Sequence, residues 1–203
     1  ASEAEMARIK TGLDKCTTNV MVCDRSYEVI YMNDASLMNL NKAESGIRES
    51  LPAFTANAVV GSVIDIFHKN PAVQRQLLDN PANLPYSVEI KLGPLLLALT
   101  ANAIMSKGGE YIGNVVEWND VTNQKAAESE VDRLIAAASA GNLGERMDEE
   151  RFEGFFKQLS VGINTMLGAI SAPVNEACDV LEKLAKGDLR ETIEGEYEGD
   201  FDR

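Results

Sequence analysis

The chain has 203 residues, of which 45% are hydrophobic and 25% charged, and this is sufficient for one or two domains with apolar cores. Its formal net charge of −13 argues against nucleic acids and anionic membranes as partners, because both attract basic surfaces. No apolar run approaches the about 18 residues of a membrane-spanning helix, and the N-terminal "ASEAEMARIK" lacks the apolar region of a signal peptide.

The N-terminal part of the chain is expected to form a helix followed by two short strands. The stretch "ASEAEMARIKTGLDKC" places its apolar residues on one helical face, which predicts a lead-in helix over residues 1–16 that pairs with a copy of itself. Two β-rich runs follow at residues 20–23 and 28–32, separated by a polar turn.

The next region is expected to contain short helices and loops. Asn33 supplies cap chemistry for a short helix in "ASLMNLN". The residues that follow are interrupted by Gly46, Pro52 and Gly61, a pattern that favours short elements over one long helix.

The only histidine, His68, precedes a short helix that Pro71 opens in "NPAVQRQLLDN". Three strand-like runs then occupy residues 86–92, 94–105 and 111–121. Two strands, several short helices and three more strands predict an α+β fold, with a five-stranded antiparallel sheet whose inner face the helices cover. A pocket between the sheet and the helices is a natural consequence.

The C-terminal part is helical and contains an internal repeat. Helical patterns occur in "NQKAAESEVDRLIAAASAGNL", in "FFKQLSVGINTMLGAIS" and, after Pro173, in "VNEACDVLEKLAKGDL". "AGNLGERM" matches "KGDLRETI", so that Gly141 aligns with Gly187 and Leu143 with Leu189, and "RFEGFF" then matches "EYEGDF". One repeat unit is therefore a helix, a glycine-containing connector, a Glu-Gly pair and a second helix.

Each predicted helix of this unit has an apolar stripe. The stripe residues are Val131, Leu134 and Ala138 in the first helix and Leu159, Ile163, Met166 and Ile170 in the second. Two such stripes leave apolar surface exposed, whereas two chains together supply the four helices of a parallel bundle. The alternative is a helical hairpin within one chain.

These segments resemble two known domain families. The "GDL" connector and the "EGxF" motif resemble a HAMP domain, with one all-α unit at residues 126–172 and the start of a second, truncated unit at 173–203. Residues 17–125 resemble a PAS domain, because "EWNDVT" is similar to the end of the last PAS strand. There, Asp120 and Thr122 are expected to fix the junction with the following helix through side-chain hydrogen bonds to the backbone.

Four blocks in order, "RIKTGLDKCTTNVMVCD", "VIYMND", "IDIFHKNPAVQRQLL" and "VVEWNDVT", resemble the haem-binding PAS domains of soluble aerotaxis receptors within the methyl-accepting chemotaxis protein family. The resemblance implies that His68 is the axial ligand of the iron of b-type haem, that Trp118 donates a hydrogen bond to bound oxygen, and that Leu99 shapes the gas-binding side. Similar receptors often have a second histidine where this chain has Val73.

The residues themselves are compatible with haem chemistry. Reversible gas binding usually uses a histidine ligand in a large apolar slot, and indole nitrogen is a donor that does not compete as a ligand. The residues expected to shape the slot are Leu95, Leu97, Leu99, Ala98, Ala101 and Ala103. Each feature also has an ordinary structural explanation, because a lone histidine is usually structural and leucines and tryptophan pack in cores.

The predicted function is that of a cytoplasmic, homodimeric chemoreceptor fragment that is not an enzyme. It senses O₂ or another diatomic gas and relays the signal through HAMP to a chemotaxis kinase and coupling protein, by way of a downstream region absent from this chain. The alternatives are a PAS–HAMP receptor with a flavin, with a small organic ligand or with no cofactor. The scattered cysteines, Cys16, Cys23 and Cys178, offer no metal-binding spacing and favour a reducing cytoplasm.

Overall fold

The computed structural model describes residues 2–68 and 70–202, so Lys69 of the "FHKNP" stretch and both terminal residues lie outside the described residues. The chain divides into two compact units between Thr122 and Asn123. The predicted domain ranges 17–125, 126–172 and 173–203 remain predictions. Within the described residues, no helix is both long and apolar enough to cross a membrane.

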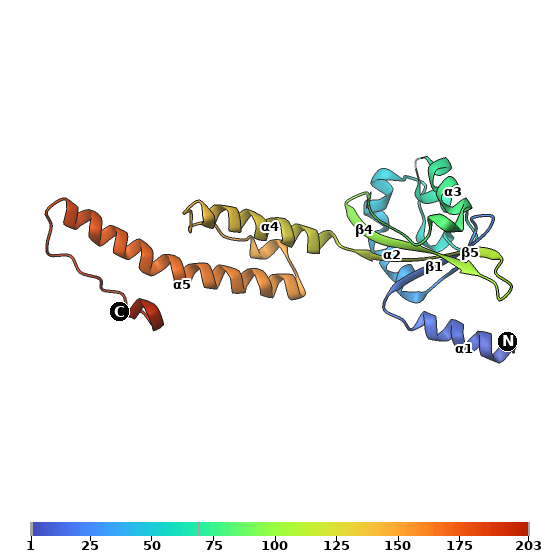
Figure 1. Cartoon of the computed structure of the whole chain (residues 1–203), viewed down its shortest axis with the longest axis horizontal. Helices are drawn as coiled ribbons and strands as arrows, with labels where there is room; N and C mark the ends of the chain where they lie inside the picture. The colour runs from blue at the N-terminus through green and yellow to red at the C-terminus, as the bar shows by residue number, and fades with distance from the viewer. Residues whose placement is uncertain (1, 69, 203) are drawn as a thin grey trace. The chain divides into compact units, whose positions relative to one another are not determined.

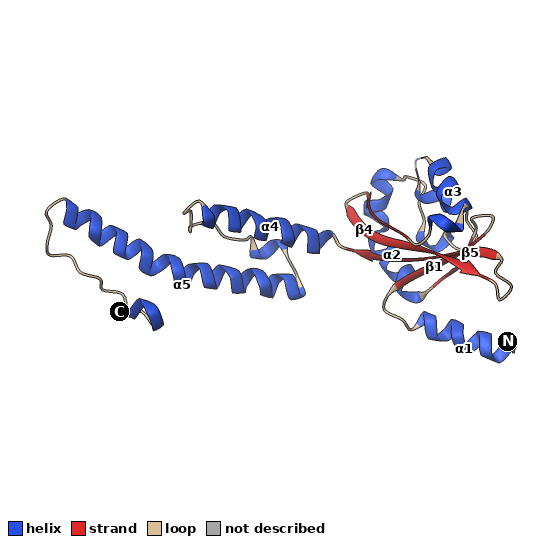
Figure 2. Ribbon diagram, in the orientation of Figure 1, coloured by secondary structure: helices blue, strands red, loops and turns tan. Residues whose placement is uncertain are grey.

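The first unit contains five strands with helices before and between them (Figure 1 and Figure 2). Its elements are α1 (Glu3–Asp14), β1 (Asn19–Asp24), β2 (Val29–Met32), α2 (Asp34–Ser50), η1 (Ala56–Ala58), η2 (Ile64–Phe67), α3 (Pro71–Asp79), η3 (Pro81–Asn83), β3 (Tyr86–Leu92), β4 (Leu95–Met105) and β5 (Tyr111–Asp120).

The strands form one antiparallel sheet in the order β2-β1-β5-β4-β3. The predicted α+β fold with a five-stranded antiparallel sheet is therefore confirmed. Because side chains alternate along a strand, residues that pair across strands form rows on one face. One row joins Tyr86 to Ala101 and Val116, and the neighbouring row joins Val88 to Leu99 and Trp118.

The core of this unit lies between the inner face of the sheet and α2. Its buried residues are Val29, Leu40, Ile47, Phe54, Ala56, Val59, Leu92, Leu97 and Trp118. Each large apolar side chain that is fully buried contributes about 1.5–3 kcal/mol to stability, so this cluster fixes α2 against the strands that line the site.

Helix α2 is longer than the sequence predicted, because it continues through Gly46 to Ser50. The glycine is used for close packing rather than for a break: a Cβ atom on Gly46 would lie 2.6 Å from Cγ of Pro94 in the turn between β3 and β4. Gly93, at φ +60°, precedes Pro94 in this turn and also packs against Gly46, because a Cβ atom on Gly93 would collide with the Gly46 carbonyl oxygen. The expectation that the helix would end near Gly46 was wrong, because the turn at Gly93 and Pro94, distant in sequence, packs so closely that only glycine fits at this position.

The second unit contains α4 (Thr122–Ser139) apart from its first residue, η4 (Glu149–Arg151), α5 (Gly154–Ala185) and η5 (Gly199–Asp202). Its core brings together both long helices and the connector between them, through Ala127, Leu134, Met147, Phe152 and Leu167. Leu134 and Leu167 thus face the same core from α4 and α5.

Helix α5 differs from the expectation of two helices separated at Pro173, because it runs without interruption through that residue. Proline lacks an N–H group and therefore cannot donate to the carbonyl of Ala169. The hydrogen bonds on both sides of Pro173 in this 32-residue helix nevertheless maintain the helix.

Candidate functional site

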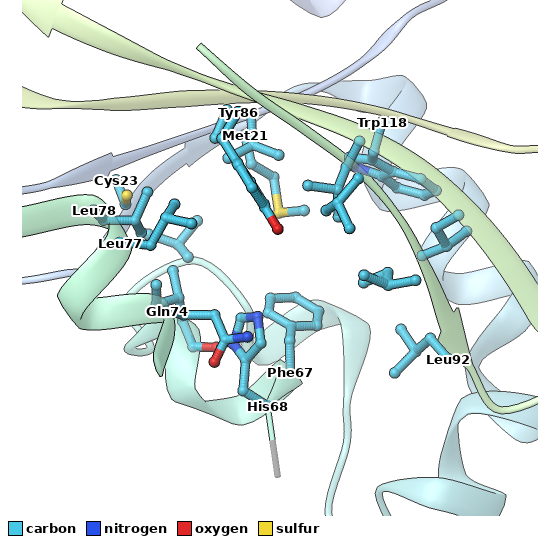
Figure 3. Close-up of a pocket in the computed structure, with 18 of the residues that line it drawn as sticks. Met21, Cys23, Phe67, His68, Gln74, Leu77, Leu78, Tyr86, Leu92 and Trp118 are labelled. Atoms are coloured by element: carbon cyan, nitrogen blue, oxygen red, sulfur yellow. The ribbon is translucent and has the colours of Figure 1, made fainter. Parts of the chain in front are cut away.

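The first unit contains an apolar cavity between the inner face of its sheet and the segment that includes η2 and α3 (Figure 3). Its volume is about 230 Å³, many times the roughly 10–15 Å³ that one water molecule requires. The strand residues that line it are Met21, Val22, Cys23, Val29, Tyr86, Val88, Ile90, Leu92, Leu97, Leu99, Ala101, Val116 and Trp118. The helical and loop residues are Leu40, Ile64, Phe67, His68, Val73, Gln74, Leu77 and Leu78.

His68 ends η2 and is half-buried at the cavity wall. Its Nδ1 lies 2.9 Å from the carbonyl oxygen of Ile64. A carbonyl oxygen can only accept a hydrogen bond, so Nδ1 carries the proton and the neutral ring keeps its lone pair on Nε2. This is the tautomer that metal-binding histidines use when the backbone orients them. His68 can therefore bind a metal through one nitrogen.

The segment around His68 is tied to α3 by an ion pair. Arg75 donates from Nε to Oδ1 of Asp65 at 3.1 Å and from a second guanidinium nitrogen to Oδ2. The hydrogen bond to Asp65 raises the pKa of the Arg75 guanidinium. Because Asp65 belongs to η2 and Arg75 to α3, the pair connects the two elements that flank His68.

Trp118 lies on β5, on the sheet side of the cavity (Figure 3). Its side chain is 4% exposed, and its buried Nε1 has no hydrogen-bond partner among the described residues. The backbone around it is fixed, because Nδ2 of Asn19 donates to the Trp118 carbonyl at 2.9 Å. A buried donor without a partner costs about 1–3 kcal/mol, so an acceptor inside the cavity would be favourably bound.

The structure brings three of the predicted site residues to this cavity: His68, Leu99 and Trp118 all line it. Leu99 pairs directly with Trp118 across β4 and β5. Of the alanines expected to border the slot, only Ala101 lines the cavity. Ala98 has the opposite parity along β4 and lines a hollow on the outer face of the sheet, so its assignment to the slot was wrong.

Asp120 and Thr122 do not line the cavity and instead meet at the end of β5. Oδ1 of Asp120 accepts from the Thr122 backbone N–H at 2.9 Å and from its hydroxyl at 2.5 Å. The backbone N–H of Leu96 donates to Oγ1 of Thr122 at 2.8 Å. The first residue of α4 is thereby joined to both β5 and β4.

Two polar residues that line the cavity were not predicted from the sequence. Gln74 places Oε1 in a buried position without a described partner, and Tyr86 lines the cavity from β3. The signal for Tyr86 was present, because it precedes Val88 by two positions and shares its face. The signal for Gln74 was its place on the apolar side of α3, beside Val73 and Leu77.

Comparisons with known proteins agree with this geometry. A model of the HAMP domain matches residues 151–203. Methyl-accepting chemotaxis protein McpB of Pseudomonas aeruginosa is 38% identical over 201 residues, which is 99% of this chain. The chain spans 30% of the length of that relative.

A solved structure supports the assignment of the first unit. It is a chain of the Aer2 receptor from Vibrio cholerae, described as a dual PAS–haem oxygen sensor. It is 42% identical, has a TM-score of 0.50, and covers 52% of this chain and 95% of its own length. The five-stranded antiparallel sheet with its helices is the PAS fold, and HAMP follows it in the chain. The chain is thus a PAS–HAMP chemoreceptor segment, in which a PAS domain is followed by a HAMP domain, and it is similar over almost its whole length to a methyl-accepting chemotaxis protein.

Proposed function

We propose that the PAS domain binds b-type haem, senses O₂ or another diatomic gas and passes the signal through HAMP to a kinase-control region. As a segment of this receptor family, the chain is a signal transducer rather than an enzyme.

One observation carries the choice of cofactor: a histidine with a free Nε2 and an unpartnered indole N–H line the same apolar cavity. Haem fits this set of residues, because it requires an axial nitrogen ligand and extensive apolar contact, and when bound it supplies an iron that takes up diatomic gases reversibly. His68 would hold it, while Leu99 and Trp118 shape the sheet side of the cavity. The 42% identity to an oxygen sensor with PAS–haem domains adds support.

The residues of the chain offer a path for the signal. Trp118 lies on β5 two positions before Asp120, whose carboxylate accepts two hydrogen bonds from Thr122 at the start of α4. A change in the hydrogen bonding of Trp118 therefore acts on the strand that leads into HAMP. A coupling free energy of about 1–3 kcal/mol is sufficient for such a relay.

We further propose that HAMP forms a parallel four-helix bundle in a homodimer. In one chain, large apolar side chains of α4 and α5 remain exposed, among them Ile135, Phe155 and Met166. A second copy would cover these exposed side chains. By the similarity to McpB, the partners of the longer receptor would be a chemotaxis kinase and its coupling protein, in the cytoplasm.

The absorption spectrum of the purified protein, expressed with haem supplied, tests the cofactor. We expect a Soret band that is lost in His68→Gly and recovered when imidazole is added to that variant, because imidazole can replace the missing ligand. A flavin spectrum would favour the flavin alternative. A colourless protein after haem reconstitution would contradict the proposal and leave a small organic ligand or no cofactor.

A further inference from the structure

The cavity has a second polar side chain on the same side as Trp118. Tyr86 is the first residue of β3, and it pairs with Ala101, which in turn pairs with Val116. Trp118 lies in the next row, with Leu99 and Val88. Tyr86 and Trp118 therefore occupy adjacent rows of one sheet face, separated by β4.

The phenol of Tyr86 points into the cavity. Figure 3 shows its oxygen directed from the sheet toward the space above His68, on the side where Trp118 lies. Ala101 is the neighbour of Tyr86 across β4, and its small side chain leaves the phenol room to extend over the strand. Tyr86 lies on the edge strand β3 and is 38% exposed, so part of its side chain also meets solvent.

The Tyr86 hydroxyl makes no hydrogen bond to any residue that the structure describes. Other tyrosines of the first unit do make such bonds: the hydroxyl of Tyr31 donates to Asp14 at 2.7 Å, and that of Tyr111 donates to the Leu78 carbonyl at 2.7 Å. Tyr86 thus directs an available O–H donor into an apolar space, where a hydrogen bond is stronger than in water.

We infer that Tyr86 is a second hydrogen-bond donor to the gas, acting beside Trp118, and that it favours O₂ over carbon monoxide. This inference rests on the proposed function. Bound O₂ carries partial negative charge and accepts hydrogen bonds at more than one position, whereas carbon monoxide is a much weaker acceptor. Two donors that approach from adjacent rows therefore stabilise O₂ selectively.

The test compares Tyr86→Phe with wild-type protein, both loaded with haem. A net hydrogen bond contributes about 0.5–1.5 kcal/mol, so we expect O₂ to dissociate roughly 2- to 10-fold faster from Tyr86→Phe. The carbon monoxide dissociation rate should change less than about 2-fold, and haem transfer to an acceptor apoprotein should keep its rate. Tyr31→Phe is the matched control, because it removes a phenol of the same unit that does not line the cavity.

Equal changes in the O₂ and carbon monoxide rates, or no change in either, would overturn the inference. Faster haem loss with unchanged gas rates would also overturn it, because the hydroxyl would then contact the porphyrin rather than the gas. Failure of the wild-type protein to bind haem is a separate result that contradicts the proposed function itself.

Discussion

Nδ1 of His68 lies 2.9 Å from the carbonyl oxygen of Ile64, the first residue of the short 3-10 segment η2 that His68 follows. The backbone therefore selects the tautomer of the ring and orients Nε2. How well the His68 ring is held in one orientation as a ligand depends on how firmly η2 is fixed. The Asp65–Arg75 ion pair and the hydrogen bond from the His68 backbone N–H to the Asp65 carbonyl at 3.0 Å provide that support.

Asp65→Asn should loosen His68 without removing it. The variant weakens the charged link between η2 and α3, so we expect haem to transfer to an acceptor apoprotein about 3- to 10-fold faster. This is less than the roughly 10- to 100-fold effects of residues that hydrogen-bond metal ligands directly, because the Asp65 side chain supports His68 only through η2. Lys10→Met, which breaks the exposed Lys10–Asp14 pair in α1, is the control and should leave the rate unchanged. Identical rates in all three proteins would show that the ion pair does not support the ligand.

Trp118→Phe should retain haem but bind O₂ more weakly. The substitution keeps an aromatic ring in the core and removes Nε1, which has no partner among the described residues. Loss of one hydrogen bond to the gas, at about 1–2 kcal/mol, lowers O₂ affinity roughly 5- to 30-fold. Equilibrium gas titration measures this, with carbon monoxide as the control ligand. Unchanged O₂ affinity together with an unchanged signal would exclude Trp118 from sensing.

Much of the fold could be predicted from local patterns. Alternation along residues 86–92 and the capping residue Asn33 identify elements that the structure confirms. The errors at Gly46 and Pro173 concern residues that often end helices but lie inside helices here. Gly46 is required by its close contact with Gly93 and Pro94, which are distant in sequence, whereas Pro173 is tolerated because the helix continues on both sides of it.

The cavity could be predicted only in outline. The resemblance to haem-binding PAS domains pointed to His68 and Trp118, and the structure places both on one cavity. Alternation along β4 places Ala98 on the outer face of the sheet, whereas Ala101 and Ala103 share the inner face, and the structure was needed to show that Ala101 lines the cavity and Ala103 does not. The partner of His68 is a backbone carbonyl, that of Ile64, and no side-chain pattern predicts it.

Thr122→Val should remove the side-chain hydrogen bonds that hold the start of α4 to the ends of β5 and β4. The change removes the hydroxyl that bonds both Asp120 and the Leu96 backbone, and at about 1 kcal/mol per net hydrogen bond the free energy of unfolding should fall by about 1–2 kcal/mol. Thr122→Ser keeps the hydroxyl and is the matched control. Urea denaturation measures stability, and gas-dependent kinase control in a longer receptor measures the relay.

If Thr122→Val lost stability but relayed the gas signal as well as Thr122→Ser, the junction would be structural only. A loss of signal in the valine variant alone would support its role in transmission.

Gly46→Ala should destabilise the PAS domain, although alanine is usually better than glycine in a helix. The new Cβ would lie 2.6 Å from Cγ of Pro94, so α2 and the turn between β3 and β4 must separate; overpacking of this kind costs about 1–3 kcal/mol. Gly12→Ala in α1 is the control, because a Cβ there meets nothing within 4 Å, and it should be neutral or slightly stabilising. Thermal unfolding of both variants checks the contrast, which equal stability losses would contradict.

Stability at alkaline pH should depend on Tyr27. Burial raises the pKa of its phenol to about 12 from the ordinary value of 10.0, and a hydrogen bond to the Asp79 carboxylate contributes to the shift. As the pH rises, the unfolded chain therefore loses the phenol proton at a lower pH than the folded chain. The contribution of Tyr27 to the free energy of unfolding is complete below pH 10 and is lost as the pH rises through about 12. Tyr27→Phe should show a shallower decline of the unfolding free energy across this pH range. Phenolate absorbance would identify the late titration in wild-type protein, and identical pH profiles for the two proteins would contradict the assignment.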